Sequence, residues 1–172
     1  MHYREMTLPD VSAFLDLTQE LGIGIWLDGG WGVDALLGTQ TRRHEDLDIV
    51  IEARHSPTLV QHLTMRGFAP APRDDTSPWN FVYGDAHGRE VDFHVIEFDD
   101  SGDARSGPTD IYPSGSLAGY GTVGARTVRC VAPGWAVRFH TGYDVDEDDW
   151  ADVSRLCERF GIPVPPDYVR FR

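Results

Sequence analysis

Residues 25–51 read IWLDGGWGVDALLGTQTRRHEDLDIVI and predict a strand, a tight turn, a helix and a second strand in close succession. The first strand is the apolar run Ile25–Leu27, which leads directly into an Asp-Gly-Gly turn. A helix is expected over Trp31–Leu37, because a glycine follows its last apolar residue and glycine commonly stands just past a helix end. The run Leu47–Ile51 is short and apolar, which is typical of a buried strand.

The rest of the chain alternates between helical and extended patterns. We expect further helices after Thr7, from His55 to near Gly67, from about Pro133 to His140, and from about Glu147 to Phe160. We expect further strands over Phe68–Ala71, Trp79–Tyr83, Glu90–Phe98 and Arg126–Val131.

The segment from 99 to 121 is rich in Gly, Ser, Asp and Pro, and we expect a long loop there. Long loops inside compact domains often act as lids, and Tyr112–Gly115 is the candidate lid. The order of elements predicts an α+β fold with a mixed sheet and flanking helices. Residues 1–131 are expected to form the main domain, and residues 132–172 a short C-terminal helical pair packed on it.

Composition narrows the classes of function. The 172 residues suit a single domain and carry a net charge of −13. All 15 basic residues are arginine, which excludes a lysine Schiff base and a P-loop. Because so acidic a surface repels nucleic acid and attracts small cations, we expect a small-molecule partner and no nucleic acid.

The chain shows no sign of a membrane segment or of export. No run of about 18 apolar residues occurs, and the first residues lack the apolar core of a signal peptide. Cys130 and Cys157 are far apart and have no metal-like neighbours, so we expect two reduced thiols in the core. These features predict a cytoplasmic protein without membrane association.

Three aspartates are candidate catalytic residues. Asp46 and Asp48 flank the start of an expected strand and point to the same face, about 7 Å apart along the chain. Like charges so close together are tolerated best when a cation lies between them, and Mg²⁺ favours such oxygen ligands. Asp92 begins another apolar strand and can supply a third carboxylate.

Gly29 and Gly30 stand between a strand and a helix, where the backbone can approach a phosphate at the helix N-terminus. Together with three carboxylates, this turn meets the needs of in-line phosphoryl transfer, in which metal ions neutralise a triphosphate and a carboxylate takes the proton of the attacking hydroxyl.

The glycine turn, Asp46-x-Asp48 and Asp92 resemble the pattern of the DNA polymerase β-like nucleotidyltransferase superfamily. Four longer strings are similar to the small lincosamide nucleotidyltransferases and, less closely, to the aminoglycoside 2″-nucleotidyltransferases. They are WLDGGWGVDALLG (Trp26–Gly38), TRRHEDLDIVIEARH (Thr41–His55), VDFHVI (Val91–Ile96) and FHTGYDVDEDDWADVSRL (Phe139–Leu156). The resemblance implies the nucleotidyltransferase fold and transfer of AMP from ATP to a hydroxyl of an antibiotic.

The resemblance also implies roles for individual residues. Asp46 and Asp48 would hold two Mg²⁺ ions, and Asp92 would be both a metal ligand and the base for the acceptor hydroxyl. Along the triphosphate would lie four residues: Gly29, Gly30, Arg42 and His44. From the residues alone, the alternatives are a solvated loop for Arg42 and Arg43 and a structural role for His44.

Five residues are candidates for the acceptor side of the site: Asp28, Trp31, His94, Tyr112 and Tyr143. The aminoglycoside enzymes carry an acidic residue two positions after the third aspartate, whereas this chain has His94, which is largely neutral at pH 7 if its pKa is near 6.5. A histidine bonded on the sheet face and a tryptophan in the core are the alternatives at positions 94 and 31. Aromatic neighbours and a neutral histidine favour a lincosamide over an aminoglycoside.

On the last expected helix, Asp149 and Asp152 share a face, whereas residues 146–148 fit charges at a helix start. Two functions of another class remain: the antitoxin half of a toxin–antitoxin pair, and a binding module without catalytic activity. The three intact aspartates disfavour the second of these. The protein is expected to be a monomer or a homodimer.

Overall fold

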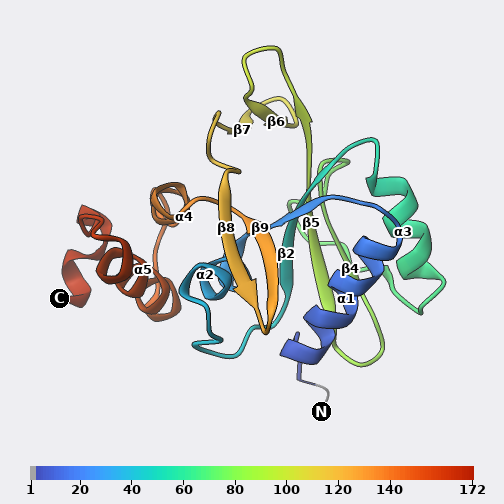
Figure 1. Ribbon diagram of the computed structural model, residues 1–172, viewed down its shortest axis with the longest axis horizontal. Coiled ribbons are helices and arrows are strands. Elements are labelled where there is room, and N and C mark those ends of the chain that lie inside the picture. The colour runs from blue at the N-terminus through green and yellow to red at the C-terminus, as the bar shows by residue number, and fades with distance from the viewer. Residues whose placement is uncertain (1–2) are drawn as a thin grey trace.

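The computed structural model describes residues 3–172 and has a mixed β-sheet at its centre (Figure 1). The helices are α1 (Leu8–Glu20), α2 (Gly29–Leu37), α3 (Ser56–Thr64), α4 (Pro133–Phe139), α5 (Glu147–Phe160) and the 3-10 helix η1 (Pro166–Phe171). The strands are β1 (Ile25–Leu27), β2 (Leu47–Glu52), β3 (Ala69–Pro70), β4 (Asn80–Gly84), β5 (Glu90–Phe98), β6 (Ala104–Ser106), β7 (Asp110–Tyr112), β8 (Gly119–Val123) and β9 (Arg126–Cys130).

The sheet runs in the order β3-β4-β5-β2-β1-β9-β8, and β6 and β7 extend from the end of β5. β2 pairs in parallel with β5 and antiparallel with β1, and β1 pairs in parallel with β9. In Figure 1, α1 and α3 lie toward the end of the sheet that contains β4 and β5, and α4 and α5 lie beyond the opposite end, at β8. The predicted α+β class with a mixed sheet and flanking helices is therefore confirmed.

Local sequence signals account for most helix ends. Thr7 caps α1 through a capping box with Asp10, and Asp146 caps α5 through a capping box with Asp149. The predicted end of α2 is confirmed, because Gly38 adopts the left-handed conformation that commonly terminates a helix. Such caps satisfy backbone N–H and C=O groups that a helix leaves without partners.

The two faces of β2 and β5 differ in a way that positions the site. On one face, Leu47, Ile49 and Ile51 of β2 are buried beside their partners on β5 in the main core cluster. On the other face, Asp48 and Asp92 lie at one end of the paired strands, and Val50 joins a smaller apolar cluster. Because strand side chains alternate between faces, the same apolar strands can present carboxylates on the opposite face.

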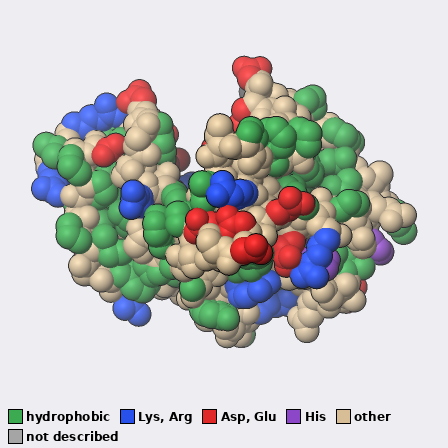
Figure 2. Space-filling view, turned by 90° about the horizontal axis from the view of Figure 1, so that it is seen from above, with side chains coloured by type: hydrophobic (Ala, Val, Ile, Leu, Met, Phe, Trp, Pro, Cys, Tyr) green, Lys and Arg blue, Asp and Glu red, His purple; other side chains and the backbone are tan. Residues whose placement is uncertain are grey.

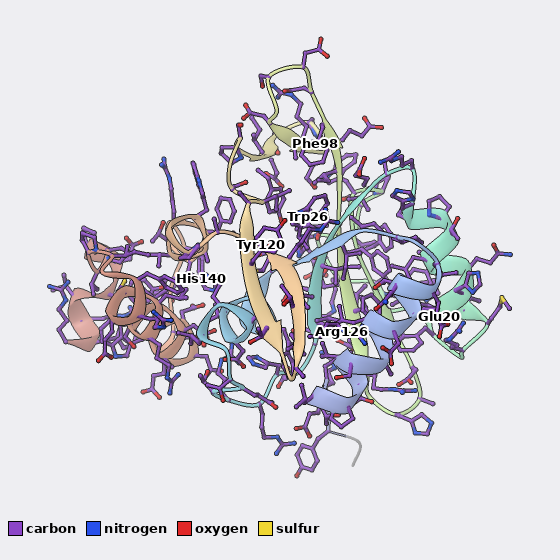
Figure 3. All side chains as sticks on the ribbon, in the orientation of Figure 1. Glu20, Trp26, Phe98, Tyr120, Arg126 and His140 are labelled. Atoms are coloured by element: carbon purple, nitrogen blue, oxygen red, sulfur yellow. The ribbon has the colours of Figure 1, made fainter. Side chains whose placement is uncertain are left out.

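The smaller cluster lies below the β6–β7 extension. Trp26 of β1 packs edge to face on Phe98 of β5, with ring centroids 5.9 Å apart (Figure 3). Ala104 of β6 is buried against the same group. The extension is thereby anchored to the sheet on the face that carries the carboxylates.

The expectation of a long loop over residues 99–121 is wrong, because β6, β7 and the start of β8 lie within it. β6 and β7 are three residues each and are rich in polar side chains, so they lack an alternating apolar pattern. β8 contains Gly121, and a Cβ there would overlap the carbonyl group of Ala35 on α2. The glycine that weakens the strand signal is therefore required by the close packing of α2 on β8.

The C-terminal helices α4 and α5 pack against α2 and against each other. Their predicted positions are confirmed, whereas η1 was not expected from its proline-rich sequence. Both cysteines are free thiols buried in the part of the chain that the structure describes. Between residues 3 and 172, no helix is both long enough and apolar enough to span a bilayer.

Candidate active site

Asp48 on β2 and Asp92 on β5 are direct neighbours in the parallel strand pair. Together with His94 they offer three possible ligand atoms that all lie within 4.8 Å of one another. The Nε2 atom of His94 lies 3.2 Å from Oδ1 of Asp48. Among residues 3–172, the buried Oδ1 atom of Asp92 has no hydrogen-bond partner. An unpaired carboxylate oxygen beside a second carboxylate fits a site for a divalent cation.

Asp46 lies immediately before β2 and is outside this group of three ligand atoms, taking all described residues into account. Burial, and then the charges of Asp48 and Asp92, raise the pKa of Asp46 to about 7. Burial raises the pKa of Asp92 to about 6, with Asp48 adding to the effect and His94 opposing it. The cluster therefore resists carrying three negative charges by itself, as expected of carboxylates that share a cation.

The expectation that His94 is neutral at pH 7 is wrong for this arrangement. Burial by itself lowers the pKa of His94, but the hydrogen bond and charge of Asp48 outweigh it and raise the pKa to about 9. The imidazole is thus a local cation beside the carboxylates. A metal ion at Asp48 would favour the neutral form instead, since metal ions and protons compete for the same groups.

The glycine turn lies directly against Asp48. Gly29 is the first residue of α2 and has φ of 54°, and a Cβ at this position would overlap the carboxylate of Asp48. The backbone N–H of Asp28 also donates to the carbonyl of Asp48, with a distance of 3.1 Å. The N-terminus of α2, which favours anions, therefore faces the carboxylate cluster.

His44 lies beside Gly30 but inside the protein. Its side chain is 3% exposed, and Nε2 lies 2.5 Å from Oδ2 of Asp34 on α2. Trp31 packs on the imidazole with ring centroids 5.0 Å apart. Asp34 also accepts hydrogen bonds from the backbone and side chain of Thr41, so one buried carboxylate holds both ends of the 41–44 segment.

Trp31 belongs to the core and does not line the acceptor side. It is 2% exposed, and its Nε1–H donates to the carbonyl of Met6 with a distance of 3.1 Å. Because the indole N–H has a hydrogen-bond partner inside the protein, burying the side chain leaves no polar group unpaired. The core alternative is the correct interpretation of this residue.

Arg42 is partly buried, and part of its guanidinium group is hydrogen-bonded to the protein. Its Nε and Nη2 atoms donate to the two carboxylate oxygens of Asp152 on α5, at 3.1 and 2.8 Å. Nη2 also lies close to Gly30, because a Cβ built on that glycine would be 2.9 Å away from it. The structure therefore places Arg42 at the N-terminus of α2, with its guanidinium group oriented by the C-terminal helix.

Tyr112, one of the candidates for the acceptor side, is the last residue of β7 and does not lie in a loop. Its hydroxyl donates to Oδ2 of Asp28 with a distance of 2.9 Å, and its ring packs edge to face on Phe139 of α4 at 5.5 Å. Burial, and then the charge of Asp28, raise the pKa of Tyr112. Phe139 in turn contacts Trp135. The predicted lid therefore begins in a strand that contacts both α4 and the glycine turn.

Tyr143 does not join this group. It is half exposed, and its hydroxyl donates to Asp149 at the start of α5 with a distance of 2.9 Å. Burial, and then the hydrogen bond to Asp149, raise the pKa of the phenol. Tyr143 therefore contacts the start of α5, and its expected role in acceptor binding stays a prediction.

Several residues near the site were not expected from the sequence: Asp34, Asn80, Trp135, Phe139 and Asp152. Asn80 lies directly across from His94 in the β4–β5 pair, and among the described residues its buried Oδ1 atom has no hydrogen-bond partner. In the sequence, Asp34 and Asp152 resemble ordinary charged residues of a helix. Their burial in the structure is what distinguishes them from exposed helix residues. Figure 2 shows acidic side chains gathered near the middle of one face, beside the lobe formed by the C-terminal helices.

A profile of the family described as "Aminoglycoside-2''-adenylyltransferase" matches residues 10–156. The "Lincosamide resistance protein" of Staphylococcus haemolyticus is 30% identical over 166 residues, which are 91% of this chain and 98% of that protein.

Two solved structures have a similar fold. The lincosamide antibiotic adenylyltransferase LnuA with bound lincomycin has a TM-score of 0.77 and 28% identity, with 88% of this chain and 97% of that chain covered. ANT(2")-Ia in complex with adenylyl-2"-tobramycin has a TM-score of 0.71 and 20% identity, with 90% and 89% covered. The second likeness concerns the fold alone.

Proposed function

Because the chain belongs to the aminoglycoside-2''-adenylyltransferase family, we propose that it transfers AMP from ATP to a hydroxyl group of a lincosamide antibiotic. The observation that best supports the chemistry is the position of Asp48 and Asp92, which are neighbours in the sheet and lie against the N-terminus of α2. Anion-binding backbone groups and carboxylates thus meet at one place, as nucleotidyl transfer requires.

The aspartates fit the divalent cations that such an enzyme uses. We propose that Asp46, Asp48 and Asp92 hold two Mg²⁺ ions, since one buried oxygen of Asp92 lacks a partner in the described part of the chain and Asp46 resists ionisation on its own. When bound, these ions supply neutralisation of the triphosphate charge. We also propose that His94, which lies next to the carboxylates, contacts the acceptor.

We propose that Asp92 takes the proton from the acceptor hydroxyl. The acceptor oxygen then bonds to the α-phosphorus, the bond between that phosphorus and the bridging oxygen breaks, and pyrophosphate leaves. The N-terminus of α2, at Gly29 and Gly30, is proposed to lie along the phosphates.

The acceptor is proposed to lie beside Asp28 and the aromatic group formed by Tyr112, Phe139 and Trp135. Aromatic rings provide apolar contact area, which suits a ligand with one amine and an apolar tail. The match to a lincosamide resistance protein across nearly its whole length supports the same class of acceptor and disfavours a minimal antitoxin.

An aminoglycoside is the second candidate acceptor. The net charge of −13 and the carboxylate of Asp28 both favour a polycation. The two classes are separated by incubating the enzyme with ATP, Mg²⁺ and a panel of antibiotics, followed by mass spectrometry. We expect lincomycin to gain the mass of one AMP; a gain confined to aminoglycosides would replace the proposed acceptor, and no gain on any antibiotic would contradict the transfer itself.

A further inference from the structure

The pair Arg42–Asp152 joins two segments that are far apart in the sequence. Asp152 is only 1% exposed, and both of its carboxylate oxygens accept from Arg42 in a two-point, forked arrangement. Such bidentate pairs fix the orientation of the guanidinium plane, which a single contact does not. Asp152 therefore determines where Arg42 points.

Arg42 lies at the place where the triphosphate is proposed to bind. Nη2, the atom that donates to Oδ2 of Asp152, is also the atom close to Gly30 at the N-terminus of α2. The positive end of the helix and the positive charge of the guanidinium are thus next to each other. Two positive groups in one place favour an anionic ligand between or beside them.

The guanidinium group has donors left over after its contacts with the protein. Of its five N–H groups, one on Nε and one on Nη2 donate to Asp152, and one on Nη1 donates to the carbonyl of Arg43 at 3.1 Å. Among residues 3–172, hydrogen bonds use three of the five, so one N–H on Nη1 and one on Nη2 remain. Asp148, which is largely exposed, lies 4.0 Å from Nη1 and adds only a weak ion pair.

Asp152 itself cannot contact a substrate, because it is buried and both its oxygens are occupied by Arg42. Its effect on any ligand must pass through the arginine. Removing either partner leaves the other charge without its counterpart, which is costly for a group as buried as Asp152.

We propose that Asp152 is a positioning residue for nucleotide binding, which holds Arg42 at the N-terminus of α2 with two N–H donors directed to triphosphate oxygens. This inference rests on the proposed nucleotidyl transfer. It also makes α5 a part of the nucleotide site, so that residues 132–172 complete the site as well as covering α2.

The test measures the dissociation constant of ATP with Mg²⁺ by titration calorimetry, together with KM for ATP and kcat, in the full-length protein. The variants are Arg42→Gln, Asp152→Asn and the double variant, with Asp148→Asn as the matched control on the same helix. We expect each single variant to weaken ATP binding about tenfold, with kcat at saturating ATP within about threefold of the wild type. The double variant should be no weaker than Arg42→Gln, and Asp148→Asn should bind ATP like the wild type.

Arg42→Lys provides a second test that leaves Asp152 in place and does not depend on the stability of Asp152→Asn. Lysine keeps the charge but cannot form the fork, so we expect it to bind ATP as weakly as Arg42→Gln does. Wild-type binding by Arg42→Lys, or by a folded Asp152→Asn, would overturn the positioning role. A wild-type protein that binds no ATP would instead overturn the proposed function.

Discussion

The Nε2 atom of His94 lies 3.2 Å from Oδ1 of Asp48, across the parallel strand pair that also makes Asp48 a neighbour of Asp92. A single histidine thus contacts one of the carboxylates proposed to hold metal. The arrangement depends on the register of β2 and β5, in which Asp48 is opposite Asp92 and Val50 is opposite His94.

Replacing Asp48 with Asn should lower kcat/KM by several orders of magnitude, because a neutral amide does not balance the charge of a divalent ion. Circular dichroism should show an unchanged fold. Glu52→Gln, on the same strand but paired with Arg54 at the surface, is the matched control and should retain activity. More than about a tenth of wild-type kcat/KM in Asp48→Asn would contradict the metal-binding role.

Asp92→Asn should abolish most of the transfer while leaving ATP binding measurable, because Asp46 and Asp48 remain. The loss expected from removing a general base is about 10²- to 10⁴-fold in kcat. Titration calorimetry with ATP and Mg²⁺ checks the second half of this prediction. Complete loss of nucleotide binding would assign Asp92 to anchoring the nucleotide rather than to proton transfer.

Asp46 makes the stability of the protein depend on pH. Its pKa is about 7 in the folded protein, above its usual value, so the folded state binds more protons than the unfolded state between about pH 4 and pH 7. The folded state therefore loses stability through this group as the pH rises across that range. Asp46→Asn, measured in EDTA, should be more stable than the wild type at pH 8, with a smaller difference at pH 5.

Unfolding in urea at the two pH values measures this change as a difference between variant and wild type. Groups that both proteins share cancel in that difference. If Asp46→Asn were stabilised by the same amount at pH 5 and pH 8, ionisation of the Asp46 carboxyl group would not destabilise the folded protein, contrary to this prediction.

Tyr112→Phe removes the hydroxyl that donates to Asp28 and leaves the ring on Phe139. We expect KM for the antibiotic to rise several-fold and KM for ATP to stay unchanged, since the contact lies on the proposed acceptor side. Tyr120→Phe is the control, because Tyr120 is 67% exposed on β8. Equal effects on the two KM values would contradict the placement of Tyr112 on the acceptor side.

Much of the fold follows from patterns within short segments. The glycine turn, the two strands that flank it and the helix caps at Thr7 and Gly38 are all visible in the sequence. β8 was missed in part because Gly121 weakens a strand pattern and yet is required by the contact with α2. A close approach of two elements leaves no local signal beyond the glycine itself.

The aspartates were identified from spacing and resemblance, but their environment was not. The pKa of His94 depends on Asp48, which comes from a different strand. Arg42 and Asp152 are 110 positions apart, and the sequence shows only that Asp152 shares a helix face with Asp149. The sequence leaves two interpretations of Trp31, and the hydrogen bond from its N–H to the carbonyl of Met6 favours the core. Contacts between distant segments decide such roles, and periodicity does not report them.

Lincomycin and tobramycin, each offered to the wild-type enzyme with ATP and Mg²⁺, distinguish the two classes of acceptor in one assay. Release of pyrophosphate gives kcat/KM for each drug under identical conditions. We predict the higher value for lincomycin, because Tyr112, which is bonded to Asp28, packs on Phe139 and the chain matches a lincosamide resistance protein over nearly its whole length. A higher kcat/KM for tobramycin would contradict the assignment of a lincosamide acceptor, and the absence of pyrophosphate with both drugs would contradict antibiotic adenylyl transfer itself.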